Sequence, residues 1–184
     1  MFYMLYNYWF YLFGSAMNLF LPVYAALVAL SIFALVFVLT SVDAAAIVWV
    51  GVPARWIAAF MLLFSLFIGS LWIAGWLRFV MTGRIPQLGG TGEAFRLVAA
   101  LDLTLQVPFL AVGALWLWKR QPWGYVVAAM WMTADAVYMI VLLAFSPFAA
   151  KAGVPGAWDQ APMWAVAGTG CLASSILLLR NLRT

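Results

Sequence analysis

Five long runs of apolar residues constrain this chain of 184 residues more than any other feature of its sequence. A helix needs about 20 apolar residues to cross the roughly 30 Å hydrocarbon core of a bilayer. Transmembrane strands would instead alternate apolar and polar residues in short segments, and these runs do not alternate. The sequence predicts an all-α integral membrane protein, a single transmembrane helical domain over residues 1–184. Its helices are expected at about residues 17–40, 55–80, 92–119, 123–146 and 162–180.

Composition agrees with a membrane protein and excludes several chemistries. Hydrophobic residues make up 68% of the chain and charged residues 8%, whereas soluble domains carry about 25% charged residues. The chain has no histidine and one cysteine, Cys171, so His-ligated metal or haem, an internal disulfide and His-dependent nucleophilic triads are excluded. We expect no enzyme activity and no cofactor or metal, although aromatic side chains could contact a bound lipid, quinone or pigment. The basic residues form no clustered patch, so we expect no nucleic-acid partner.

The N-terminal segment, residues 2–14, is aromatic and carries no charge. It is too short to span a bilayer unaided. Two alternatives remain open from the sequence: a sixth, short or tilted helix embedded in the membrane, or a helix lying at the headgroup boundary, where amphipathic rings settle.

The connections and basic residues suggest a topology. Gln121 and Pro122 leave a turn so short that the helices on either side are antiparallel neighbours. The Gly- and Pro-rich residues 147–161 are expected to form a surface loop. Short segments on one side carry a group of basic residues, and the positive-inside bias places that side in the cytoplasm. We therefore predict a multi-pass protein of the cytoplasmic (inner) membrane with a cytoplasmic C-terminus. The group comprises Arg55, Lys119, Arg120, Arg180 and Arg183.

Two carboxylates lie inside predicted membrane helices, Asp102 in the third and Asp135 in the fourth. A charged side chain at mid-bilayer costs about 2.5–3.5 kcal/mol on insertion scales, so each of the two carboxylates is expected to have a structural or functional role. Helix rise and antiparallel packing bring the two groups within about 10 Å of each other. With Gln106 and Tyr138 as donors, the two carboxylates form a predicted polar seam. The seam either handles protons or cations, or it locks the helices together, in which case Arg78 or Arg96 pairs with Asp102.

Small residues recur every four positions on the last helix. They form a face on which another helix can approach closely, and that helix could belong to this chain or to a partner. We expect this face, or the aromatic N-terminal segment, to contact a partner subunit, a second copy of the chain or lipid. The residues of the face are Ala167, Gly170, Cys171, Ser174 and Ser175.

About half of the chain resembles a group of uncharacterised bacterial multi-pass membrane proteins. The similarity rests on LDL at residues 101–103, VP at 107–108 and LWLWKRQPWGY at 115–125, together with NLFLPVY at 18–24 and SIFAL at 31–35. The resemblance implies a six-helix bundle, which favours a helix in the N-terminal segment, although that segment is short here. It implies no activity.

These observations favour a non-catalytic structural or accessory subunit that packs against membrane lipids and other membrane protein subunits, or against itself. The alternative is a small proton- or solute-handling transporter or channel that uses the seam of Asp102 and Asp135.

Overall fold

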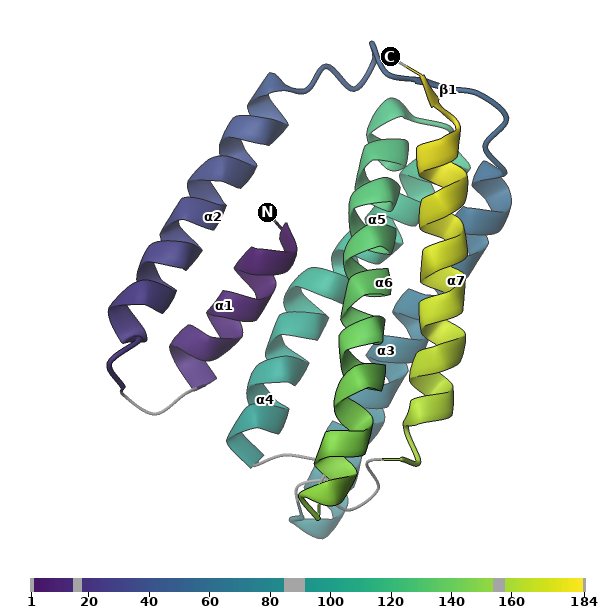
Figure 1. Cartoon of the computed structure of the whole chain (residues 1–184). Helices are drawn as coiled ribbons and strands as arrows, with labels where there is room; N and C mark the ends of the chain where they lie inside the picture. The colour runs from purple at the N-terminus through teal and green to yellow at the C-terminus, as the bar shows by residue number, and fades with distance from the viewer. Residues whose placement is uncertain (1, 15–17, 85–91, 154–157, 184) are drawn as a thin grey trace.

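The computed structural model describes residues 2–14, 18–84, 92–153 and 158–183, which fold into an all-α bundle (Figure 1). Five helical stretches are long and apolar enough to cross a membrane, so the predicted fold class is confirmed and the chain is a multi-pass membrane protein. One stretch is interrupted by a π-helical segment, η1. The helices are α1 (Phe2–Gly14), α2 (Leu21–Ser41), α3 (Ala54–Thr82), α4 (Gly92–Leu101), η1 (Asp102–Gln106), α5 (Val107–Trp118), α6 (Pro122–Lys151) and α7 (Ala161–Arg180).

The start of α2 lies a turn later than the sequence suggested. The expected first residue, Met17, lies outside the described residues. Asn18 accepts a hydrogen bond from the backbone N–H of Phe20 through its side-chain oxygen, at 2.8 Å, and this local bond favours a turn over a helix. Pro22 then stands in the first helical turn, where its missing N–H costs nothing.

The expected loop at residues 147–161 is wrong in its first part, because α6 continues through Pro147 to Lys151. A proline inside a membrane helix is tolerated when neighbouring groups compensate the lost backbone bond. Here Ser146 and Ala149, on either side of Pro147, are both buried against neighbouring helices. Packing therefore holds the last turn of α6 helical.

The N-terminal segment is a helix packed inside the bundle. Figure 1 shows α1 running alongside α2, and α1 also contacts α4 and α6. Leu5 and Tyr6 are buried, while Tyr8 and Tyr11 pack against the ring of Tyr24 on α2. These contacts support the embedded alternative over a helix that lies across the end of the bundle.

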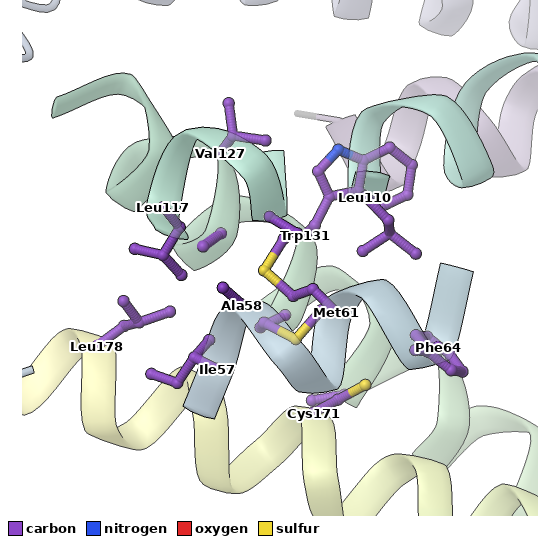
Figure 2. Packing of buried hydrophobic residues seen from close by; sticks show 14 of the residues in the cluster. Ile57, Ala58, Met61, Phe64, Leu110, Leu117, Val127, Trp131, Cys171 and Leu178 are labelled. Atoms are coloured by element: carbon purple, nitrogen blue, oxygen red, sulfur yellow. The ribbon is translucent and has the colours of Figure 1, made fainter. Parts of the chain in front are cut away.

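The apolar core lies between α3, α5, α6 and α7. Figure 2 shows Met61 of α3 pointing into it among Leu110, Trp131 and Cys171, which come from the other three helices. Small residues permit this close packing: a Cβ on Gly113 would lie 2.6 Å from a methyl group of Val127. The four helices therefore form one continuous packed unit.

One end of the bundle is closed by a short strand pair. The strands β1 (Val48–Trp49) and β2 (Leu182–Arg183) are antiparallel, and Trp49 stacks on Tyr125 with ring centroids 5.4 Å apart. The start of α3, the turn between α5 and α6 and the end of α7 meet at this end (Figure 1). The basic group that carried the topology prediction thus lies at one end of the bundle.

Candidate functional site

The π-helical segment η1 begins at Asp102 and ends at Gln106, shortly before Pro108. Proline has no backbone N–H, so the regular α-helical ladder is interrupted at this position. The N–H of Val107 instead bonds to the carbonyl of Asp102, five residues back. The Ser65 hydroxyl of α3 donates to the carbonyl of Val107 at 2.9 Å and ties the irregular turn to its neighbour. Segments of this kind are frequent at functional sites.

Asp102 is buried and accepts hydrogen bonds on both carboxylate oxygens. The hydroxyl of Tyr6 on α1 donates to Oδ1, and the indole Nε1 of Trp72 on α3 donates to Oδ2 at 2.7 Å. Three segments far apart in the sequence therefore meet at one carboxyl group. Two strong donors are the arrangement that makes a buried carboxylate tolerable.

Asp135 on α6 is buried as deeply but is bound less completely. The side-chain amide of Gln106 donates to Oδ1 at 3.1 Å. The other oxygen, Oδ2, is buried and forms no hydrogen bond with any part of the chain that the structure describes. The carboxyl groups of Asp102 and Asp135 are close enough to interact electrostatically, and Cys171 of α7 interacts with Asp135 in the same way.

The structure brings together most of the predicted seam. Asp102, Gln106 and Asp135 lie in one cluster. The rings of Tyr138 and Tyr6 contact each other edge-on, with their centroids 6.3 Å apart. Arg78 does not belong to the cluster: it is exposed, and among the described residues no ion pair joins it to Asp102. The proposed counter-ion is wrong because hydrogen-bond donors from α1 and α3 occupy both oxygens instead.

Two members of the cluster were missed from the sequence, Tyr6 and Trp72. Tyr6 was hidden because the placement of residues 2–14 was open. Trp72 was missed because tryptophan is common at membrane boundaries, yet it stands eighteen residues after the start of α3 and is buried. An indole N–H buried at that depth needs a hydrogen-bond acceptor. This requirement could have predicted a contact between Trp72 and one of the buried carboxylates.

The small-residue face of α7 packs against other helices of this chain, so of the two alternatives the internal neighbour is correct and the expected contact of this face with a partner or with lipid is wrong. Ala167, Cys171, Ser174 and Ser175 are buried, and a Cβ on Gly170 would collide with the ring of Phe60 on α3. The hydroxyls of Thr133 on α6 and Ser175 share a hydrogen bond of 2.6 Å. The small residues therefore allow α3 and α6 to pack closely against α7.

The chemistry available to the cluster is limited to carboxyl, phenol, indole and amide groups. Within the described ranges, no group of three or more Cys, Asp or Glu residues could hold a metal ion. Carboxyl groups can exchange protons, and the phenol and amide can donate hydrogen bonds to them. No protein-family model, no curated protein and no solved structure matches the chain.

Proposed function

We propose that this protein is a non-catalytic accessory subunit that packs against another membrane protein. The observation that supports this proposal is the exposure of the second half of α2. Six consecutive residues, from Val36 to Ser41, are exposed, and six residues pass more than once around a helix. Only 11% of the most apolar stretch of α2 is buried, against 33 to 44% for the other four membrane-crossing stretches.

The lengths of α1 and α2 explain where the exposed half begins. The 13 residues of α1 measure about 20 Å and the 21 residues of α2 about 31 Å. Since α1 lies along the first half of α2, about 10 Å of α2 extends beyond it. Val28 and Ser31 are buried, and Leu35 still packs against the apolar core, whereas the residues from Val36 to Ser41 are exposed.

A transmembrane helix of a partner protein is the occupant that this geometry favours. Such a helix would continue the interface that α1 forms with α2, on the same side and with the same apolar character. The exposed side chains include bulky aromatic rings, which are typical anchors of an interface, and Phe33 and Phe37 are 73% and 71% exposed. Lipid, a second copy of this chain or a segment preceding residue 1 are the competing occupants.

The experiment is a mass measurement on the protein extracted from its native membrane in mild detergent, with and without a double substitution. We expect a particle that contains this chain and a different polypeptide in fixed stoichiometry. Phe33→Ala with Phe37→Ala should release the partner, while the particle of the control, Phe145→Ala with Phe148→Ala, stays unchanged. The control pair lies on α6 and is similarly exposed.

Photocrosslinking locates the contact independently. A photoreactive phenylalanine analogue at position 37 should form an adduct with the co-purified polypeptide, and one at position 145 should not. A particle with the mass of one chain, a homo-oligomer, or release by the control substitutions would each contradict the proposal.

We further propose that the protein resides in the cytoplasmic (inner) membrane of a bacterium with its C-terminus in the cytoplasm. The basic residues at the end of the bundle that carries β2 support this orientation. In intact cells, Gln121→Cys and Asn181→Cys should resist a membrane-impermeant thiol reagent, and Gly153→Cys should react. Labelling of Gln121→Cys from outside would reverse the orientation.

A second candidate function is proton or solute handling, favoured by the half-bound carboxyl group of Asp135. Ionisable residues inside a membrane are rare and frequently mark ion or proton pathways. Purified protein in liposomes should then conduct protons or a solute, and Asp135→Asn should abolish that flux with unchanged insertion. Absence of any flux in the wild-type protein would remove this candidate.

A further inference from the structure

The two carboxyl groups of the cluster differ in how they are bound. Asp102 receives a phenol on one oxygen and an indole on the other, from two separate helices. Asp135 receives one amide on Oδ1, and its Oδ2 is buried with no hydrogen bond to the described residues. Exposure does not distinguish them, since they are 8% and 4% exposed.

This difference decides which group can hold a negative charge. An ionised carboxylate buried away from water is costly unless it is fully hydrogen-bonded or paired with a cation. Only Asp102 has a donor for each oxygen. Two neighbouring carboxylates also repel each other, so one added proton relieves the pair. The proton is expected on the carboxyl group whose negative charge is stabilised by fewer hydrogen bonds, and that group is Asp135.

We infer that Asp135 is a reversible proton-binding site and that Asp102 is the fixed carboxylate beside it. Oδ2 of Asp135 gains a proton from solvent, its negative charge is lost, and no electron is transferred. Gln106 can continue to donate to Oδ1 in either state. The ligand is a proton rather than a metal ion, because a protein site for a cation needs several ligands, and among the described residues no group of three or more Cys, Asp or Glu side chains could hold one.

The other titratable groups around Asp135 do not supply a counter-charge. Tyr6 of α1 donates to Asp102, Tyr138 of α6 contacts the Tyr6 ring, and Cys171 of α7 is a buried thiol. The segments α2 and α5 carry no ionisable residue except Tyr24, which packs on α1. The arginines of α3 and α4, which are Arg55, Arg78 and Arg96, are all exposed. Protonation is therefore the means of neutralising Asp135.

Infrared difference spectroscopy tests this inference on the full chain in lipid vesicles. A protonated carboxyl group has a C=O stretching band that is separate from the carboxylate bands. The wild-type protein should show this band at neutral pH, and alkaline pH should remove it reversibly. Asp135→Asn should eliminate the band, whereas Asp102→Asn and the exposed control Asp43→Asn should retain it.

Carbon-13 labelling of aspartate in the wild-type protein provides a readout without any substitution, because the band must shift if it belongs to an aspartic acid. Absence of the band at neutral pH would overturn the inference, and so would its persistence in strong alkali or its loss in Asp102→Asn alone. The inference concerns proton binding only, and it supplies the ligand for the second candidate function. If Asp135 binds a proton but liposomes show no flux, the proton-binding site stands and the transport function is ruled out.

Discussion

The packed four-helix unit and the pair formed by α1 and α2 are held together differently. In the unit of α3, α5, α6 and α7, side chains such as Met61 and Leu110 are completely buried. In the pair, α2 is exposed along most of its length, and α1 joins the unit through the Tyr6 hydrogen bond to Asp102 and a few apolar contacts. Dense packing stabilises the first region, and a smaller set of contacts attaches the second, among them the Tyr6 hydrogen bond and the packing of Leu35 of α2 against the core.

The difference shows how a membrane protein can combine a rigid part with a weakly attached one. Lipid tails are as apolar as leucine, so helices associate through close packing and hydrogen bonds rather than through hydrophobic burial. Small residues give the four-helix unit close packing, as at Gly168, where a Cβ would lie 2.9 Å from the Met139 side chain. The pair of α1 and α2 has bulky rings at its contact instead, including Tyr8, Tyr11 and Tyr24.

The largest effect is expected inside the four-helix unit. Met61→Ala should lower the free energy of unfolding by about 3 kcal/mol, because the fully buried side chain leaves a cavity. Unfolding in mixed detergent micelles measures the change. Met81→Ala, at an 83% exposed position on the same helix, is the control and should be nearly neutral. Equal losses at the two positions would contradict the dense packing of the four-helix unit around Met61.

A slightly smaller loss is expected at the turn between α5 and α6. Gly124→Ala would place a Cβ against the backbone of Trp116 and Leu117, which cannot move as a side chain can. We expect a loss of about 2 kcal/mol from overpacking, measured by the same unfolding experiment. Ala144→Ser, at an exposed site on α6, is the control and should unfold like the wild type. An unchanged stability of Gly124→Ala would show that the two helices are not in close contact there.

The contact between the two regions should contribute less. Tyr6→Phe removes the hydroxyl that donates to Asp102 and should cost about 1 kcal/mol, a typical value for a hydrogen bond between membrane helices. Spin labels on α2 and α6 should also report a wider distribution of distances between the helices. Tyr11→Phe, at a half-exposed position where α1 packs on Tyr24 of α2, tests whether loss of any hydroxyl on α1 has this effect. An unchanged distance distribution in Tyr6→Phe would mean that apolar contacts alone attach α1.

The smallest effect is expected on the outer face of α2. Phe33→Ala should change the free energy of unfolding of the isolated chain by less than about 0.5 kcal/mol, as is usual for an exposed position. The same substitution should weaken the native particle if a partner helix covers α2. A large loss in the isolated chain would place Phe33 in an internal contact and remove the proposed interface.

The membrane helices were predictable because crossing hydrocarbon imposes a length and a composition on every span. For this reason α3 and α7 begin within one residue of their expected starts, at Ala54 and Ala161. The end of α6 was not predictable from Pro147, because the burial of Ser146 and Ala149 on either side of the proline depends on tertiary packing. The π-helical segment was also unforeseen, although Pro108 was visible.

The candidate site divides in the same way. Asp102, Gln106 and Asp135 could be found from the sequence because each is a polar residue within an apolar span. Tyr6 and Trp72 could not be assigned to it, because tyrosine and tryptophan are common at membrane boundaries and composition does not report depth. The sequence also could not predict which helix packs on the small-residue face of α7. Gly170 permits the close approach of any helix, and only the structure shows that the neighbouring side chain is Phe60 of α3.

By itself the sequence determined that this chain is a bundle of membrane-crossing helices with two buried carboxyl groups, because hydrocarbon tolerates neither a polar span nor an unexplained charge. Only the tertiary structure decided how those groups are satisfied: two donors at Asp102, one at Asp135. Partners in a hydrogen bond come from helices far apart in the chain, and their rotation and depth follow from packing. Packing depends on the shapes of all the helices together, which no single segment encodes.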